Sequence, residues 1–377
     1  MNAAPNQAES RRFLLRWEQA LRPLLPPEGA RLLAAVSGGC DSVCLAALLR
    51  HSAGERAPRT LALGHVHHGL RPEADAEEAF VRRLGESWGL PVFAARVRPR
   101  ETASARGWSL EQAARADRRD ALARLCREAR CGVLALGHQM DDQAETVLLR
   151  LLRGAGPRGL GGMEPSLTLP LEAGQTEPIT LIRPLLGWRR RQVRAMARAL
   201  GLEWLEDASN LDPRHARNRV RHELIPTLER DYNPRVVRAL AGLADRLRRE
   251  SAPAARAAEE TARRCLRPAA PGETALLVDL DGLATEPEAV ATRVLWLAYQ
   301  RLAGPDAPLG GAHMRALWSL ATAPNAPPAE VHLPGAVRAR RRRSTLRLEY
   351  HEPRPGNEKN GAALQNPVEG GPGGSLD

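Results

Sequence analysis

The stretch that decides the fold runs from Arg31 to Ser42 and reads R-L-L-A-A-V-S-G-G-C-D-S. Its first half is a short apolar run that predicts a buried β-strand, and an apolar helical pattern follows from Val43 to about residue 50. Between strand and helix, Gly38 and Gly39 allow a sharp turn that presents backbone N–H groups to anionic oxygens. The sequence therefore predicts a phosphate site at the N-terminus of a helix. A plain glycine-rich turn, in which Ser or Asp caps the helix, remains the alternative.

Other side chains of the turn narrow the kind of phosphate site. Ser37 and Ser42 add hydroxyl donors, whereas Asp41 repels phosphate and would act through Mg²⁺. The turn is neither G-x-x-x-x-G-K-[ST] nor G-x-G-x-x-G, so an ordinary NTPase or a dehydrogenase is excluded. The single lysine, Lys359, lies in a tail rich in Pro, Gly and Asn, which also excludes a Schiff-base lysine in the folded part.

Short apolar runs alternate with helical patterns along the first half of the chain. This alternation predicts an α/β fold, with a parallel sheet, helices on both faces, and the loops after the strands on one edge. From about residue 217 the strand signal fades and long helical patterns predict a mainly helical second domain. The expected strands lie at 31–36, 60–66, 91–97, 132–136 and near 179–182, and the helices at 43–50, 73–88, 109–130, 141–153 and 189–200.

Four segments are expected. Residues 1–28 contain an amphipathic helix, 29–215 form the phosphate-binding domain, 216–352 form the helical domain, and 353–377 are a disordered tail. Within them, the glycine-rich segment 154–162 is expected to be a mobile loop, and a strand-like pair is expected at 330–333 and 345–349.

Composition limits the class of protein. The 377 residues carry a net charge of +11, and 54 of the 55 basic residues are arginine, which favours a polyanionic partner. No apolar run approaches the ~18 residues of a membrane span, so no membrane partner is expected. The five cysteines are odd in number and have no C-x-x-C spacing, which predicts reduced thiols in the cytoplasm.

The S-G-G-x-D-S turn resembles the signature of the PP-loop ATP pyrophosphatases, which activate a carbonyl oxygen as an AMP adduct and release pyrophosphate. Three further blocks resemble the tRNA(Ile)-lysidine synthetase family. The resemblance is close over residues 30–235 and looser to about residue 350. The blocks are H-V-H-H-G-L-R at 65–71, G-H-Q-M-D-D-Q-A-E-T at 137–146 with L-R-G at 152–154, and I-R-P-L-L at 182–186 with E-D-A-S-N at 206–210 and R-N-R-V-R at 217–221.

The resemblance implies a reaction and its partners. ATP, with Mg²⁺, adenylates the C2 carbonyl oxygen of a cytidine in the CAU anticodon of tRNA(Ile) and releases pyrophosphate, and free L-lysine then attacks C2 and displaces AMP. The resemblance also implies that residues 29–215 form a PP-loop ATP pyrophosphatase domain and residues 216–352 a tRNA-binding domain. The implied catalytic residues are Asp41, Arg115, Asp142 and Glu145; the ATP-binding residues are Ser37, Gly38, Gly39, Cys40, Asp41, Ser42, His67 and His138, with Asp41 as metal ligand; the substrate-binding residues are Asp141, Asp142, Glu145, Arg217, Asn218 and Arg221.

Local chemistry leaves alternatives for several of these residues. Asp142-x-x-Glu145 fits a capping box as well as an active site. His65, His67 and His68 resemble metal ligands at first sight, but no matching Cys or carboxylate trio follows.

The arginines also have ordinary explanations. Arg115 stands four residues after Glu111, which fits a surface ion pair. The family usually has an aromatic residue where this chain has Asp120, a departure that bears on Arg115. Arg189–Arg191, Arg217, Arg219 and Arg221 form a solvated helix face or, without balancing acids nearby, contacts to RNA phosphates. The run 338–343 is expected to suit a tRNA stem.

Two rival functions remain. A PP-loop tRNA thiolase would need a sulfur-carrying cysteine, for which Cys40, Cys126 and Cys131 are the candidates. A non-catalytic RNA-binding protein with a vestigial nucleotide site is the second rival. The oligomeric state is open, and a homodimer is compatible with the sequence.

Overall fold

The computed structural model describes residues 7–26, 30–69, 74–169, 177–206, 215–270, 273–304, 307, 309–323 and 330–350. The expected tail at 353–377 and the 207–210 part of the E-D-A-S-N block lie outside the described residues.

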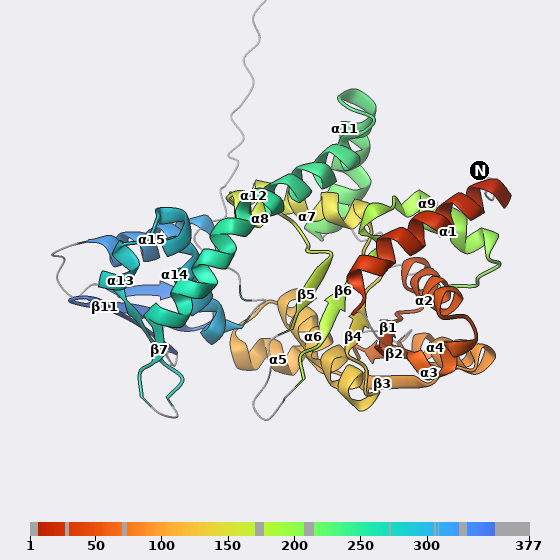
Figure 1. Cartoon of the computed structure of the whole chain (residues 1–377), viewed down its shortest axis with the longest axis horizontal. Coiled ribbons are helices and arrows are strands. Elements are labelled where there is room, and N and C mark those ends of the chain that lie inside the picture. The colour runs from red at the N-terminus through yellow and green to blue at the C-terminus, as the bar shows by residue number, and fades with distance from the viewer. Residues whose placement is uncertain are drawn as a thin grey trace, which may run out of the picture.

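The first sheet has six strands in the order β3-β2-β1-β4-β6-β5, and only β5 runs antiparallel to its neighbour. The chain moves outward from β1 in one direction to β3 and then returns to place β4 on the other side of β1 (Figure 1). The strands are β1 (Leu32–Ala35), β2 (Leu61–His67), β3 (Val92–Arg96), β4 (Val133–Ala135), β5 (Ser166–Thr168) and β6 (Thr180–Ile182).

Both faces of this sheet are covered by helices. Successive residues of β1 point to opposite faces of the sheet, and both are buried. Ala34 packs in one buried cluster with α1, α2 and α9, whereas Leu33 packs in another with α6. Strands buried on both faces are continuously apolar, as the L-L-A-A-V run is. The predicted fold class, a mostly parallel sheet between helices, is confirmed. The helices of this part are α1 (Gln7–Leu21), η1 (Arg22–Leu24), α2 (Cys40–Ala53), η2 (Gly54–Arg56), α3 (Ala57–Thr60), α4 (Ala74–Trp88), α5 (Pro99–Arg106), α6 (Leu110–Glu128), α7 (Met140–Leu152), α8 (Pro157–Leu160), η3 (Pro184–Gly187) and α9 (Arg190–Ala199).

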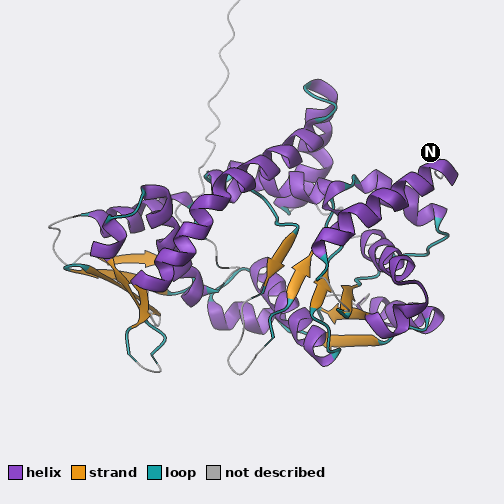
Figure 2. Cartoon of the chain, in the orientation of Figure 1, coloured by secondary structure: helices purple, strands orange, loops and turns teal. Residues whose placement is uncertain are grey.

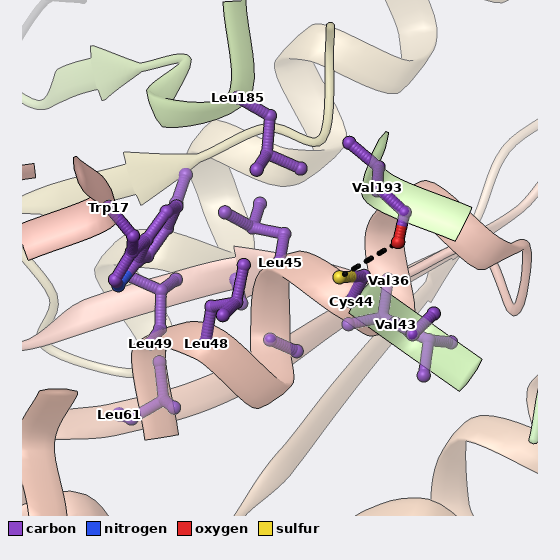
Figure 3. Packing of buried hydrophobic residues seen from close by; sticks show 14 of the residues in the cluster. Trp17, Val36, Val43, Cys44, Leu45, Leu48, Leu49, Leu61, Leu185 and Val193 are labelled. Carbon is purple, nitrogen blue, oxygen red and sulfur yellow. Dashed lines mark hydrogen bonds between the residues drawn. The ribbon is translucent and has the colours of Figure 1, made fainter. Parts of the chain in front are cut away.

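The core between α2 and its neighbours fixes the helix that follows the glycine turn. Figure 3 shows Trp17 of α1 against the apolar face of α2, with the Cys44 thiol directed at the Val193 carbonyl of α9, 3.7 Å away. Trp17 is fully buried and its indole N–H donates to Ser52 Oγ at 2.8 Å. Burial of a large aromatic side chain with its polar atom satisfied anchors α1 over α2.

The rest of the chain is mainly helical, as predicted, but contains more sheet than expected (Figure 2). An antiparallel sheet in the order β7-β8-β11-β10-β9 packs under α14 and α15. The elements are α10 (Ala216–Arg219), the π-helical turn η5 (Val220–Leu224), α11 (Ile225–Asp231), α12 (Val236–Cys265), β7 (Leu266–Pro268), β8 (Leu276–Asp279), α13 (Leu280–Ala284), α14 (Glu288–Ala303), α15 (Gly311–Thr322), β9 (Glu330–Leu333), β10 (Val337–Arg342) and β11 (Thr345–Tyr350).

Segment 154–162 is not the unsupported loop that its glycines predict. It contains the short helix α8, and the guanidinium of Arg150 donates to the carbonyl oxygens of Gly159 and Gly162 at 2.7 and 2.9 Å. Arg248 of α12 binds the carbonyl of Gly161 as well. These contacts hold the segment against α7 and α12. They also supply hydrogen-bond donors to backbone carbonyls that would otherwise lack them.

Within the described residues, no helix combines the length and apolarity that crossing a bilayer requires.

Candidate active site

The site lies where the first sheet reverses its strand order. The chain leaves β1 toward β2 on one side, and β4 lies on the other side of β1, so the segments after β1 and β4 diverge at a crevice. Ligands of open α/β sheets bind at such a point, outside the carboxyl ends of the strands. The S-G-G-C-D-S turn follows β1, and the G-H-Q-M-D-D block follows β4.

A glycine brings these two segments into contact. A Cβ on Gly137 would lie 3.1 Å from the Asp41 carbonyl oxygen and 3.2 Å from Ser42 Cα. Those are backbone atoms and cannot rotate away. A side chain at residue 137 would therefore push the segment after β4 away from the first turn of α2 by a few tenths of an ångström.

The turn after β1 is an ordered structure with internal hydrogen bonds. Gly39 is the N-cap of α2, so helix α2 begins at Cys40, three residues earlier than predicted. Ser42 Oγ donates to the Gly39 carbonyl at 2.9 Å and accepts from the Ser37 N–H at 3.1 Å. Gly38 has a φ of 88°, which favours glycine, and its carbonyl accepts from the Leu205 N–H at 2.9 Å.

These bonds separate the roles of the two serines. Ser42 is buried and its proton is committed to the turn, so it shapes the loop and does not reach outward. Ser37 is exposed, with its Oγ 3.2 Å from Ser42 Oγ, and remains the hydroxyl that can meet a ligand.

Asp41 has the chemistry of a cation ligand. Its Oδ1 is buried and accepts no hydrogen bond among the described residues. Burial, and then the charge of Asp142, raises the pKa of Asp41 to about 6, although Arg190 and Arg194 oppose the shift. An orphaned carboxylate oxygen in the first turn of a phosphate-facing helix fits Mg²⁺, which binds through one or two carboxylates together with phosphate oxygens.

Glu145 is the most enclosed acidic group of the site, with none of its surface exposed. Arg221 binds it through Nε to Oε1 at 2.7 Å and Nη2 to Oε2 at 3.0 Å. Arg217 Nε lies 2.7 Å from Oε2, and Arg190 Nη2 lies 3.1 Å from Oε1. The same three guanidinium groups reach Asp142 Oδ1 at 3.1 to 3.3 Å. Two carboxylates from α7 thus share three arginines from α9, α10 and η5.

This arrangement corrects one premise about the basic stretch at 217–221. The sequence offers no balancing acids nearby, yet Arg217 and Arg221 pair with carboxylates 72 to 79 residues away. Both arginines project toward α7 from a helix interrupted by the π-helical turn η5. Single π-helical turns inside α-helices occur frequently at functional sites.

The capping box of α7 is also different from the one that the spacing predicts. Gln139 is the N-cap, and its backbone N–H donates to Asp142 Oδ2 at 3.0 Å, while its side-chain oxygen accepts from the Asp141 N–H at 2.6 Å. Asp142 is therefore the N3 residue of the box and not its start. It serves the helix cap with one oxygen and the arginines with the other.

Asp141 faces another direction. Its carboxylate accepts from Arg189 Nη2 at 3.0 Å and from the Arg190 backbone N–H at 2.8 Å. Arg189 is buried and also binds Glu229 at 2.9 Å. Asp141 therefore fixes the start of α9 through Arg189 and the Arg190 backbone.

His65 and His67 each make hydrogen bonds to other parts of the protein. His65 Nδ1 lies 2.9 Å from the Val36 carbonyl, directly before the turn, and burial lowers the pKa of His65. His67 Nδ1 accepts from the Gly69 N–H at 3.1 Å, which leaves its Nε2–H for Asp75 at 3.2 Å. Among the described residues, no group of three or more His, Cys, Asp or Glu side chains could hold a metal ion.

His138 lies after β4 in a strongly basic environment. Burial, and then the charges of Arg118, Arg183, Arg217 and Arg115, lower its pKa well below the ordinary value, so the imidazole is neutral. Its Nδ1 is buried without a hydrogen-bond partner among the described residues.

Two further predicted site residues, Arg115 and Asn218, lie near these groups. Arg115 is exposed on α6 and close enough to His138 for its charge to act there. Asn218 is buried beside the arginine pair.

Arg194 is a residue near the site that sequence reasoning did not single out, and Arg190, expected on a solvated face or at RNA phosphates, instead pairs with Asp142 and Glu145. Both act on the pKa of Asp41. Their i, i+4 spacing, which puts them on one face of α9, was the available signal.

The cysteines are structural thiols. All five are buried. Burial raises the pKa of Cys40 and of Cys126 to about 12 and that of Cys131 to about 11, so none is a ready thiolate. Cys126 Sγ donates to the Cys131 carbonyl at 3.0 Å.

The basic run 338–343 is largely neutralised within its own sheet. It forms β10 and the turn after it, and Arg338 pairs with Glu349 at 2.6 Å and Arg340 with Glu330 at 2.6 Å. Arg341 caps α15 through the Ala321 carbonyl at 2.8 Å. The expected tRNA-stem surface is therefore reduced to Arg342 and Arg343, which are exposed.

Comparison with known proteins agrees with this geometry. The family described as a PP-loop domain matches residues 12–228. The chain is 40% identical over 294 residues to the tRNA(Ile)-lysidine synthase of Symbiobacterium thermophilum, and 39% identical over 297 residues to that of Bordetella bronchiseptica. These matches cover 76% and 77% of the chain, and 58% and 79% of the two relatives.

The tRNA(Ile)-lysidine synthase of Azoarcus sp. is 44% identical over 230 residues, which is 61% of this chain and 48% of that protein. The chain thus spans about half the length of several relatives that it matches. Among solved structures, it is similar to U34-tRNA thiolase NcsA from Methanococcus maripaludis, with a TM-score of 0.48 and 19% identity over 63% of this chain and 80% of that one. The chain belongs to the tRNA(Ile)-lysidine synthase family, and residues 12–228 are its PP-loop domain.

Proposed function

We propose that this protein ligates free L-lysine to C2 of the wobble cytidine in the CAU anticodon of tRNA(Ile), at the expense of ATP. The cytidine O2 attacks the α-phosphorus, and the bond to pyrophosphate breaks. The lysine ε-amine then attacks C2, the C2–O2 bond breaks, and AMP leaves with that oxygen. The amine loses a proton, and lysidine is the product.

The observation that carries the proposal is the convergence of a phosphate turn and a buried acidic pair at one sheet edge. Gly137 packs against the backbone of Asp41 and Ser42, so the helix that bears Asp142 and Glu145 begins beside the nucleotide turn. A nucleotide-activated base and an amine nucleophile must meet within a few ångströms, which such a junction allows.

The residues of the turn bind and orient the triphosphate. The free N–H groups at the start of α2 and the Ser37 hydroxyl donate to phosphate oxygens, and the preorganised turn needs no reordering. Asp41 would hold Mg²⁺, which neutralises charge that develops on the phosphates. His67, His138 and Cys40 line the nucleotide site, and Arg115 acts on the phosphates from α6.

The acidic pair binds the lysine ammonium. Asp142 Oδ1 and both Glu145 oxygens already accept two or more hydrogen bonds from guanidinium groups, so we infer that the ammonium takes the place of one of these groups. Arg217 has the most exposed side chain of the three, at 36%, and is the one that can move. We infer that Arg217, Asn218 and Arg221 turn toward the RNA when substrate is bound. A carboxylate at 142 or 145 then takes the proton of the amine.

Further parts of the proposal follow from the sequence. The chain divides at about residue 216 into an ATP-using domain and a tRNA-binding domain, and it works in the cytoplasm. The thiolase alternative has no support from the cysteines, because their thiols are buried and protonated.

Pyrophosphate release separates this proposal from a non-catalytic RNA-binding protein. The protein should release pyrophosphate from ATP when tRNA(Ile) with a CAU anticodon is present, and much more slowly when that anticodon is changed to GAU. Pyrophosphate release that ignores the tRNA, or no release at all, contradicts the proposal.

A further inference from the structure

The long helix α12 has two opposite faces of different character. Its buried residues pack on α7 in the first half and on α14 and the second sheet in the second half. They are Val237, Ala244, Ala258, Thr261, Ala262 and Cys265. With 100° per residue, they lie within roughly 120° of the helix circumference. The opposite face is free of the protein interior.

Arginine dominates that opposite face. Arg235, Arg238, Arg246, Arg249 and Arg256 fall within about 80° of one another on a helical projection and extend over roughly 30 Å. We call these five residues the α12 stripe. All five are exposed, and we find no ion pair for any of them within the described part of the chain. Two acids lie on or beside this face: Asp245, which Arg248 already binds, and the exposed Glu260, one helical turn after Arg256.

An exposed aromatic residue stands at the N-terminal end of the stripe. Tyr232 is 78% exposed, and Figure 1 shows the connection between α11 and α12 at the tip of a projection from the body. The tip is rigid, because the Tyr232 N–H donates to the Leu228 carbonyl at 3.2 Å and Asn233 Oδ1 accepts from the Arg235 N–H at 2.8 Å. A tyrosine held in water on an ordered turn offers both ring faces to a ligand.

The tip is physically continuous with the active site. One helical stretch from α10 through η5 to α11 carries Arg217 and Arg221 at its start and Tyr232 at its end. Fifteen residues of helix separate Arg217 from Tyr232, which corresponds to about 22 Å. A polynucleotide with one base in the active site therefore reaches the tip within a few nucleotides.

We propose that the α12 stripe binds the sugar–phosphate backbone of the substrate tRNA and that Tyr232 stacks on one of its unpaired bases. This inference rests on the proposed function and assigns a surface to its RNA. Unpaired guanidinium groups in a row match a row of phosphates, and an exposed ring matches a base. A membrane surface does not fit, since such helices insert an apolar face and the apolar face of α12 is buried in the protein.

Salt-dependent RNA binding tests the stripe. The triple variant Arg238→Glu, Arg246→Glu, Arg249→Glu is compared with a control that changes the charge equally at exposed arginines elsewhere, Arg12→Glu, Arg124→Glu, Arg301→Glu. The dissociation constant of a tRNA(Ile) transcript is measured for each at several KCl concentrations. Three lost phosphate contacts should weaken binding by about 100-fold at 0.1 M salt and lower the slope of log K against log salt by about 2 to 3. The control should change the slope by less than one unit.

A second pair of variants tests the tyrosine. Tyr232→Ala should weaken binding by roughly 5- to 100-fold with the salt slope unchanged, whereas Tyr232→Phe should bind like the wild type. Stacking needs the ring and not the hydroxyl.

The outcomes separate the two levels of the proposal. If the wild type binds tRNA(Ile) and releases pyrophosphate but the triple variant binds as tightly as the control, the stripe is overturned and the proposed function stands. If the wild type neither binds tRNA nor responds to it, both are overturned. If the triple variant keeps its tRNA binding but loses binding to anionic phospholipid vesicles, the role of the α12 stripe in RNA binding is also overturned, in favour of a membrane surface.

Discussion

Arg221 holds Glu145 in a two-point ion pair, Nε to Oε1 at 2.7 Å and Nη2 to Oε2 at 3.0 Å, although 76 residues separate them in sequence. Glu145 is fully enclosed, and its charge is balanced by ion pairs with Arg221, Arg217 and Arg190. The pair joins α7 to the helix that begins the second half of the chain. Under the proposed function, stability and substrate binding would therefore depend on the same contacts.

Removing the acid from this cluster should be costly. Glu145→Ala leaves three guanidinium groups around a buried site, and we expect a loss of about 3–5 kcal/mol in the free energy of unfolding, measured in urea. The control is Glu206→Ala, whose carboxylate binds Arg194 with 69% of its side chain exposed and should cost less than about 1 kcal/mol. Equal losses for the two variants would show that the cluster does not act as a buried ion network.

Arg217 should couple lysine binding to RNA binding. If the lysine ammonium displaces this guanidinium, Arg217→Ala removes the competitor and should lower the KM for lysine while raising the KM for tRNA(Ile). The measurement is initial-rate kinetics with each substrate varied. Arg124→Ala, which removes an exposed arginine of α6, serves as the control. A rise in both KM values would contradict the displacement.

Asp41 should make nucleotide use depend on pH. Burial raises its pKa to about 6, so a proton competes with Mg²⁺ below that pH, and the apparent affinity for Mg²⁺ with ATP should fall about tenfold per pH unit. Because the folded state binds this proton more tightly than the unfolded chain, the carboxylate also destabilises the fold as the pH rises through about 6. Asp41→Asn should abolish pyrophosphate release and raise the melting temperature at pH 8.

The check on this prediction is a pH series from 5 to 8. Pyrophosphate release at subsaturating Mg²⁺ should rise steeply up to about pH 6 and then level off for the wild type. A flat profile would contradict the role of Asp41, and so would an Asp41→Asn variant with normal release.

Gly137 should be required for nucleotide binding and not for the fold as a whole. A methyl group there meets the backbone of Asp41 and Ser42 at 3.1 and 3.2 Å, so Gly137→Ala should raise the KM for ATP at least tenfold. Gly132→Ala is a matched control at the other end of the same strand, since a Cβ there meets nothing within 4 Å. Similar KM values for the two variants would mean that the close approach does not shape the site.

The buried thiols should be dispensable for chemistry. Cys126→Ala with Cys131→Ala removes two of the three thiols on which a thiolase could rely, and we expect unchanged lysine incorporation with a modest loss of stability. Sulfur incorporation into tRNA by the wild type, lost in the double variant, would restore the thiolase.

The sequence predicted the parts of the structure that depend on short stretches of chain. The L-L-A-A-V run and its glycines define β1 and the turn, because apolar periodicity and backbone freedom are local properties. The partners of Arg217 could not be found this way, since its acids lie 72 and 75 residues earlier and meet it only in the folded chain. Likewise, the sequence of β10 is read as a basic run and not as a strand. Its only buried residues are Val337 and the small Ala339, so the apolar alternation of a strand is hidden among its arginines.

Incorporation of radiolabelled lysine is the most direct test of the central claim. The protein, with ATP, Mg²⁺ and tRNA(Ile) bearing a CAU anticodon, should attach one lysine per tRNA and release one AMP and one pyrophosphate for each. The Asp142→Asn and Glu145→Gln variants should lose lysine attachment while they keep ATP binding. A folded wild-type protein that binds ATP and tRNA(Ile) but attaches no lysine would contradict the account.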